Sequence, residues 1–345
     1  MIYSYKLIFI MILFMSTLIS ISSYTWFGTW MGLEINLLSF IPLLKLKNNS
    51  LSTESSMKYF LIQALASSMF LFAIMTIMMM NNMISDIFNI NKFLMMIINS
   101  SLMLKMGAAP FHFWFPEIIE GMNWMNSLIL MTWQKIAPLM LLSYTMKFNN
   151  YIIIIVMIST LIGSIGGLNQ TSMRKIMVYS SINHLGWMIS SFLINDMIWI
   201  IYFLIYSLIS ISFILMMNMY NIYYLKQMFM FMSKNLILKL ILLFNLLSLG
   251  GLPPFTGFLP KWMIIQYLSL NFMPMLLFMI MMTLITLFFY LRISYSSLMM
   301  SNNEMKFNFN KNYYKNSLTM ILSFISINGL IILTLLFNFF KKDLS

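Results

Sequence analysis

The sequence predicts an all-α polytopic membrane protein with about eleven transmembrane helices, arranged as two inverted five-helix repeats and a final helix. Three observations predict this class. Of the 345 residues, 61% are hydrophobic and 8% are charged, whereas soluble domains carry roughly 25% charged residues. Apolar runs of about 20 residues, the length of a spanning helix, recur along the whole chain. Two of these runs contain the same unusual interruption.

The interruption combines glycine and proline at fixed spacing. Gly107-Ala-Ala-Pro-Phe-x4-Pro-Glu117 is matched by Gly251-Leu-Pro-Pro-Phe-x4-Pro-Lys261, 144 residues later (251 − 107). Neither residue type continues a helix cleanly, so both segments are expected to be helices that break inside the membrane. Interrupted hydrophobic segments at corresponding positions of two halves are typical of transporters that are built from repeats.

The apolar runs define the expected elements in chain order. The first run is followed at once by Trp26 and lacks a small-residue cleavage site, so we expect a spanning helix there and not a signal peptide. The fourth and ninth spans carry the interruptions and continue as 111–120 and 258–270, and the longest polar connections are 45–56, 220–235 and 298–316. The expected spans are 5–22, 24–44, 57–80, 92–110, 124–146, 150–168, 174–194, 197–219, 236–256, 273–297 and 317–340. We therefore expect one membrane domain over 1–345, with repeats at 5–146 and 150–297 and a terminal helix at 317–340.

The basic residues are distributed unevenly between the two sides of the expected membrane domain. Thirteen of the 20 lysines and arginines fall in connections on the side of the N-terminus, and four fall on the opposite side. Basic residues accumulate in cytoplasmic loops, so the N-terminus is expected in the cytoplasm or the mitochondrial matrix and the C-terminus across the membrane. This loop bias accounts for the net charge of +12, which argues against nucleic-acid binding.

Four charged residues fall inside expected spans: Glu34, Lys105, Lys135 and Lys261. A charged side chain at the bilayer centre costs about 2.5–3.5 kcal/mol on insertion scales. Lys105 and Lys261 lie close enough to the interruptions that their long stems could reach the interface. Glu34 and Lys135 have about ten apolar residues on both sides, and this alternative does not suit them.

These residue types point to proton exchange as the chemistry. Burial disfavours a charged lysine and a nearby carboxylate favours it, so a lysine that gains and loses such a partner can take up and release a proton. His112 and His184 also fall within apolar segments, where a structural hydrogen bond and a relay role are equally open. The chain has no cysteine, which excludes thiolate ligation of metals or iron–sulfur clusters.

Six motifs together give a family resemblance. The motifs match the family in the same order along the chain, within residues 24–295. They are Ser52–Phe60, Met106–Glu117, Thr132–Pro138, Gly166–Thr171, Ser180–Trp187 and Leu249–Trp262. They resemble the antiporter-like membrane-arm subunits of mitochondrial NADH:ubiquinone oxidoreductase, respiratory complex I, in the subunit 2 family. Residues 298–345 resemble the family only in being a polar loop and a final helix.

The resemblance implies a proton-translocating core subunit that is coupled to NADH oxidation and ubiquinone reduction elsewhere in the complex. Glu34 and Lys105 match the family's intramembrane ion pair, Lys135 the central lysine of a Lys/Glu/water relay, and Lys261 its terminal lysine. Flavin, iron–sulfur clusters and quinone are expected on other subunits, with no cofactor on this chain. The expected partners are neighbouring membrane-arm subunits and lipids, without nucleic acid.

The resemblance also implies a location in the inner mitochondrial membrane. The abundance of Met, Ile, Asn and Phe suggests an AT-rich coding sequence, as in a mitochondrial genome. Two other functions stay open. A stand-alone cation/proton antiporter would use the same broken helices and lysines. A scaffold subunit that moves no ions would give Lys135 and Glu34 no function to offset their insertion cost.

The charge distribution yields a topology prediction. The 298–316 loop should face the matrix and Lys341-Lys342 the opposite compartment, because basic residues accumulate on the inner side. Protease treatment of mitoplasts tests this, and the loop should be protected while the outer face is accessible. Cleavage within 298–316 from the outer face would contradict the eleven-span arrangement.

Overall fold

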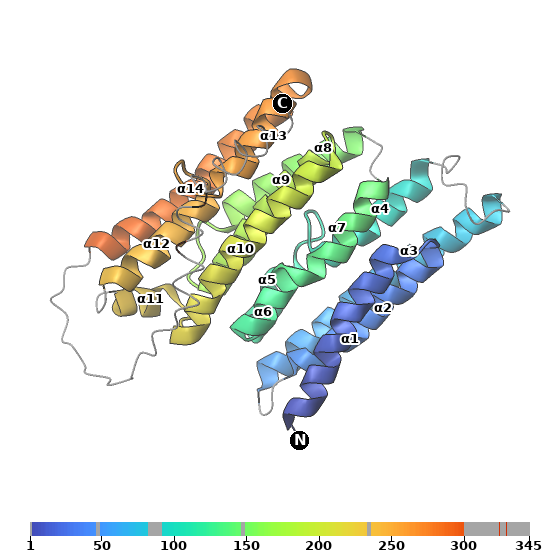
Figure 1. Ribbon diagram of the computed structural model, residues 1–345, viewed down its shortest axis with the longest axis horizontal. Helices are drawn as coiled ribbons and strands as arrows, with labels where there is room; N and C mark the ends of the chain where they lie inside the picture. The colour runs from blue at the N-terminus through green and yellow to red at the C-terminus, as the bar shows by residue number, and fades with distance from the viewer. Residues whose placement is uncertain are drawn as a thin grey trace, which may run out of the picture. The chain divides into compact units, whose positions relative to one another are not determined.

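The fold is described from a computed structural model, which covers residues 2–45, 49–81, 92–145, 149–232 and 236–299 together with Phe324 and Gly329. These residues form fourteen α-helices (Figure 1). The chain divides into two compact units, Met1–Ser159 and Thr160–Ser345, and each is described by itself. Apart from Phe324 and Gly329, the expected terminal helix at 317–340 lies outside the described residues, as does most of the 298–316 loop.

The first unit begins with three long helices that pack in sequence. α1 packs on α2, and α2 on α3, which in turn contacts α4 and α5. α7 closes the unit by packing against both α1 and α4. The bounds are α1 Ile2–Ser22, α2 Trp26–Leu44, α3 Ser50–Asn81, α4 Lys92–Met106, α5 Trp114–Gly121, α6 Trp124–Met131, α7 Trp133–Thr145 and α8 Asn149–Gly166, the last of which crosses the boundary between the units.

The second unit is organised around α10, which contacts α9, α12 and α13. α14 packs against α9, α11, α12 and α13 (Figure 1). The bounds are α9 Met173–Ser191, α10 Asp196–Tyr220, α11 Leu225–Met232, α12 Leu236–Gly250, α13 Phe258–Asn271 and α14 Met273–Met299.

The helices follow the expected spans with three differences. α3 begins at Ser50, within the expected 45–56 connection, and α11 lies inside the expected 220–235 connection. The expected 124–146 span is interrupted at Thr132. Within the described residues, five helices are long and apolar enough to cross a membrane by themselves: Tyr5–Ser22, Trp26–Leu44, Ser50–Met79, Asp196–Tyr220 and Met273–Met299.

The interruption at Thr132 has a local cause. Its hydroxyl donates to the carbonyl oxygen of Leu128 at 2.7 Å, and its torsions, φ −115° and ψ −74°, are distorted from those of a regular α-helix while staying in the right-handed helical region. Serine and threonine that bond back to the preceding turn often bend helices. The amide of Lys135 bonds to the Thr132 carbonyl, three residues before it, at 3.2 Å as the helix restarts. Lys135 therefore lies near a helix end and not in the middle of a continuous span.

The two predicted interruptions end their helices in the same way. Gly107 and Gly251 have φ values of 72° and 80°, the left-handed geometry that glycine adopts without steric cost. After α4, the N–H groups of Gly107 and Ala108 bond back to the carbonyls of Leu104 (3.2 Å) and Met103 (3.1 Å). This pair of bonds is a Schellman motif, which satisfies the last carbonyls of a helix.

The bonds recur after α12, from Gly251 to the carbonyl of Ser248 (3.1 Å) and from Leu252 to that of Leu247 (3.4 Å). The following turns match as well, with cis peptide bonds at Ala109-Pro110 and Pro253-Pro254. α5 and α13 then begin at Trp114 and Phe258. Pro116 and Pro260 occupy the third residue of these helices, where a helical N–H has no partner within the helix and proline is tolerated.

Adjacent glycines at the end of α12 provide a matched stability test. Gly251→Ala should destabilise the protein by about 1–2 kcal/mol, because left-handed geometry disfavours a Cβ atom. Gly250→Ala should be tolerated, because its added Cβ would meet nothing closer than 3.5 Å and alanine favours helix. Thermal denaturation of the assembled protein measures both effects. Equal shifts for the two variants would show that the left-handed geometry is not required.

Candidate functional site

The three lysines expected inside the membrane are the buried lysines of the described part of the chain. Lys105, Lys135 and Lys261 are 8%, 1% and 6% exposed. Fully buried lysines are rare in proteins unless they are paired. Each lies close to a helix interruption: Lys105 in the last turn of α4, Lys135 three residues after Thr132, and Lys261 at the fourth residue of α13. At all three positions, therefore, a buried lysine lies beside irregular backbone.

Lys135 lies at the centre of the first unit. Its Nζ is 5.4 Å from the centroid of the Phe115 ring on α5, a distance at which a cation is attracted to an aromatic face. The preceding residue, Gln134, donates from Nε2 to Oδ1 of Asn36 on α2 at 2.9 Å. Pro138 has no N–H to offer the carbonyl four residues before it. The beginning of α7 therefore combines a buried ammonium, a side-chain amide pair and a freed backbone carbonyl.

Lys105 and Glu34 lie in the same unit, on α4 and α2. The Glu34 carboxylate acts electrostatically on Lys105, but they form no ion pair within 4.0 Å in the described structure. The Lys105 Nζ is buried without a hydrogen-bond partner among the described residues and lies 5.9 Å from the centroid of Phe70. Glu34 is only partly buried on α2. The expected Glu34–Lys105 pair is therefore a longer-range interaction in this structure, not a closed salt bridge.

Neutral side chains satisfy the backbone carbonyls around Lys105. The amide of Gln63 on α3 donates to the Lys105 carbonyl at 3.3 Å, and the indole of Trp114 on α5 donates to the Leu104 carbonyl at 3.1 Å. The Lys105 ammonium is not needed for this purpose. Its position in the last turn of α4 still suits a cation, because the C-terminal end of a helix carries partial negative charge.

Lys261 has a different environment in the second unit. Its Nζ donates to the carbonyl oxygen of Gly250, the last residue of α12, at 2.8 Å. The ammonium therefore caps the C-terminus of the interrupted helix, where a cation is stabilised by the helix dipole. A Cβ atom added to Gly251 would lie 2.9 Å from Nζ, so the glycine also leaves room for the lysine.

The two histidines are buried and hydrogen-bonded. His112 Nδ1 lies 3.2 Å from the Pro110 carbonyl oxygen, and because a carbonyl only accepts, this contact requires a proton on Nδ1. His184 Nδ1 lies 2.8 Å from the hydroxyl of Tyr202 on α10, and its ring is 5.1 Å from that of Tyr206. Each histidine therefore has at least one structural partner. Within the described residues, His, Asp and Glu side chains form no group of three that could hold a metal ion.

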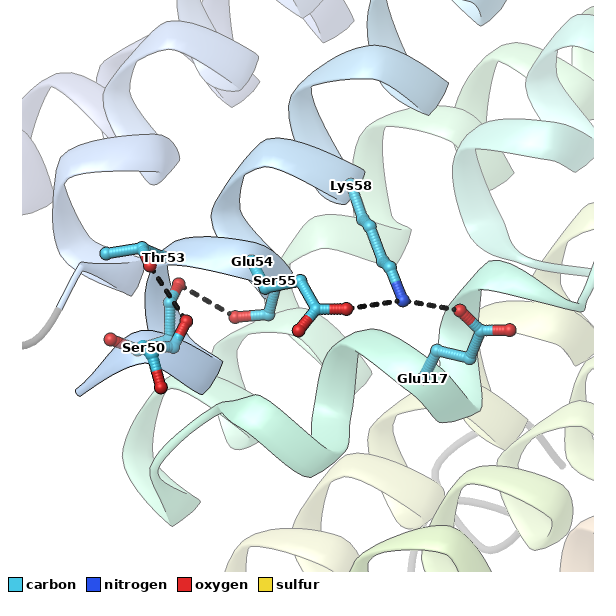
Figure 2. Close-up of polar contacts among 7 residues, drawn as sticks. Ser50, Thr53, Glu54, Ser55, Lys58 and Glu117 are labelled. Atoms are coloured by element: carbon cyan, nitrogen blue, oxygen red, sulfur yellow. Dashed lines mark hydrogen bonds and ion pairs between the residues drawn. The ribbon is translucent and has the colours of Figure 1, made fainter.

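A second charged group joins α3 to α5, and its lysine, Lys58, is one of the thirteen basic residues counted on the side of the N-terminus. Lys58 Nζ lies 3.0 Å from Glu54 Oε1, one turn earlier on α3, and 2.9 Å from Glu117 Oε2 on α5 (Figure 2). The side chains are 41% and 59% exposed in both pairs. Such exposed pairs contribute about 0.2–1 kcal/mol. The Glu54–Lys58 spacing of four residues is a sequence signal for the first pair, but nothing local predicts the bridge to Glu117.

Comparison with known proteins places these features in a family. The family described as NADH:quinone oxidoreductase/Mrp antiporter, TM, matches residues 23–289. The chain is 53% identical over 336 residues to NADH-ubiquinone oxidoreductase chain 2 of Anopheles gambiae, with 96% of this chain and 97% of the relative covered. It is 48% identical to the chain of the same name from Locusta migratoria, with 87% of each chain covered.

Solved structures share the fold at low sequence identity. Respiratory complex I from Thermus thermophilus matches with a TM-score of 0.82 and 21% identity, covering 94% of this chain and 78% of that one. The archaeal membrane-bound sulfane sulfur reductase matches with a TM-score of 0.81 and 15% identity, covering 97% and 74%. The length and identity of the sequence matches show that the chain belongs to the NADH-ubiquinone oxidoreductase chain 2 family, within the NADH:quinone oxidoreductase/Mrp antiporter family.

Proposed function

We propose that this chain moves protons across the inner mitochondrial membrane through a relay of Glu34, Lys105, Lys135, Lys261 and water. Family membership makes it a subunit of NADH-ubiquinone oxidoreductase, which assembles with other subunits of complex I. The observation that carries the relay is the burial of three lysines beside helix interruptions. Intramembrane ionisable residues mark ion and proton pathways, and interrupted backbone at membrane depth is tolerated where it lines a water-filled cavity.

In this relay, the proton affinity of Lys105 changes with the distance to the Glu34 carboxylate. The two side chains lie farther apart than an ion pair, so a movement of α2 or α4 that brought them within ion-pair distance would strengthen their attraction. A lysine whose carboxylate partner approaches and withdraws binds its proton more and then less tightly. Lys135, in the same unit, is the next proton acceptor, and Lys261 is the terminal one.

His112 and His184 have subsidiary roles in this proposal. The contact between His112 and the Pro110 carbonyl lies within the first interruption, so the ring can accept a proton at Nε2 while Nδ1 holds the turn. The contact between His184 and Tyr202 offers a hydroxyl that can both donate and accept. Either ring could therefore pass a proton without losing its structural bond.

The order of helices supports the proposed repeat architecture. Each unit of the proposed repeat has three helices, then an interrupted pair, then a fifth span. In the first repeat these are α1, α2, α3, the α4–α5 pair and α6–α7, and in the second they are α8, α9, α10, the α12–α13 pair and α14. The matching bonds after α4 and α12 add local support. We place the repeats at 5–146 and 150–297 and a final helix at 317–340, which makes eleven spans. Five spans in each repeat are an odd number, so the second repeat is inverted relative to the first.

This arrangement sets the proposed orientation. The N-terminus lies in the matrix and the C-terminus in the intermembrane space, in keeping with the distribution of basic residues. The redox cofactors lie on other subunits, and the chain itself is encoded in the mitochondrial genome. Identity over nearly the whole length to chains named as an oxidoreductase subunit favours this function over a stand-alone antiporter.

Two substitutions test the relay. Lys135→Met should abolish its proton exchange while preserving the length of the stem, and Glu34→Gln should remove the charge that acts on Lys105 while preserving shape. Protons translocated per NADH oxidised, or turnover if the two are tightly coupled, should fall in both variants while the complex still assembles. Lys226→Met, at an exposed position on α11, is the matched control and should behave as wild type.

The opposite result is equally informative. If Lys135→Met and Glu34→Gln leave assembly, turnover and proton translocation unchanged, the buried charges are structural. The scaffold function would then replace the relay.

A further inference from the structure

The short helix α5 depends on tertiary contacts for its position. It has eight residues, and its N-cap residue, Phe113, makes no side-chain capping bond. Isolated helices of this length are marginal in stability. Among the contacts that position α5 are a hydrogen bond from the Trp114 indole to the Leu104 carbonyl and the ion pair between Glu117 and Lys58. The helix also approaches α3 closely at Gly121, where an added Cβ would lie 2.4 Å from the Leu51 carbonyl oxygen.

One face of α5 reaches the centre of the first unit. Phe115 is fully buried, with its ring 5.4 Å from the Lys135 ammonium. The same residue packs on the first interruption, because a Cβ added to Gly107 would lie 3.2 Å from the Phe115 ring. Phe115 therefore lies between the end of α4, which carries Lys105, and the side chain of Lys135.

The other face of α5 carries the ion pair. Glu117 follows Phe115 by two residues, which corresponds to about 200° around a helix of 3.6 residues per turn. Glu117 consequently projects away from Phe115 toward Lys58, where Figure 2 shows the bridge that also includes Glu54. A displacement of Glu117 that moves or rotates α5 must also move the aromatic ring beside Lys135.

We propose that Lys58 is a positioning residue for proton transfer in the first unit: by bridging Glu54 and Glu117, it fixes α5 and holds the Phe115 ring between the Gly107 turn and Lys135. The bridge is exposed, so it contributes little to folding. The bridge instead determines the position of Phe115, and a cation–π contact is sensitive to the position of the ring. This inference rests on the proposed relay through Lys135.

Within the described residues of the second unit, the equivalent position forms no such bridge. Lys261 occupies the slot that corresponds to Glu117 and is directed inward to the Gly250 carbonyl. α13 is also longer than α5, with fourteen residues. The positioning role is therefore specific to the first interruption and does not follow from the repeat.

The test uses the assembled complex in membranes from cells that carry each variant. Lys58→Met and Glu117→Gln should each lower proton-coupled turnover per assembled complex by about 1.4- to fivefold, if the full free energy of an exposed ion pair enters the rate. Lys58→Arg, and the double exchange Lys58→Glu with Glu117→Lys, should restore it because they rebuild the bridge. Glu54→Gln, which leaves the contact to α5 in place, should have a smaller effect.

Assembly is measured separately on native gels, so that the rate refers to intact complex only. A loss of assembled complex with normal turnover in the remainder would overturn the inference, because the bridge would then be only structural. Failure of both Lys58→Arg and the double exchange to rescue turnover would overturn it as well.

Lys135→Met, measured in parallel, separates the two proposals. If that variant loses proton translocation while Lys58→Met matches wild type, the relay stands and the positioning role is wrong. If Lys135→Met translocates protons normally, the relay fails, and with it the inference that depends on it.

Discussion

The arrangement of buried charges depends on one constraint: the carbonyl groups at the ends of two interrupted helices must find hydrogen-bond partners. In hydrocarbon, each backbone group must find a partner inside the protein, and α4 and α12 both end next to buried charge. The same Schellman bonds satisfy the penultimate carbonyls in both units. A carbonyl that these bonds leave over is satisfied differently in each unit: Gln63 donates to the Lys105 carbonyl of α4, whereas the ammonium of Lys261 donates to the Gly250 carbonyl of α12.

This difference assigns different physical behaviour to two lysines that look alike in sequence. Lys105 is left without a hydrogen-bond partner among the described residues, and the carboxylate of Glu34 lies beyond ion-pair distance. Lys261 is tied to the backbone of the helix that it follows. Bonds from an ionised donor are roughly twice as strong as neutral ones. In the proposed relay, loss of the Lys261 proton would therefore weaken a backbone contact, whereas loss of the Lys105 proton would weaken an attraction between helices.

Much of this could be predicted from sequence because it depends on length, periodicity and local residue types. Apolar runs of spanning length placed the helices, and Gly107 and Gly251 marked both interruptions. The charges of Lys105, Lys135 and Lys261 identified the buried sites. Three features were not predicted, for different reasons. The hydroxyl of Thr132 interrupts a span through a local bond that hydropathy does not register, and α11 forms within a polar connection. The bridge from Lys58 to a carboxylate 59 residues later depends on a tertiary contact that no local pattern encodes.

The slot shared by Glu117 and Lys261 shows why matching backbones do not imply matching roles. Both residues are the fourth of a helix that begins 144 residues from its counterpart (258 − 114). Glu117 points to the exposed side and joins α5 to α3, whereas Lys261 is buried and joins α13 to α12. A repeated backbone therefore supplies the irregular geometry that charge requires inside a membrane. The side chain placed on that backbone decides whether the site forms an exposed bridge to a neighbouring helix or buries an ammonium against a helix end.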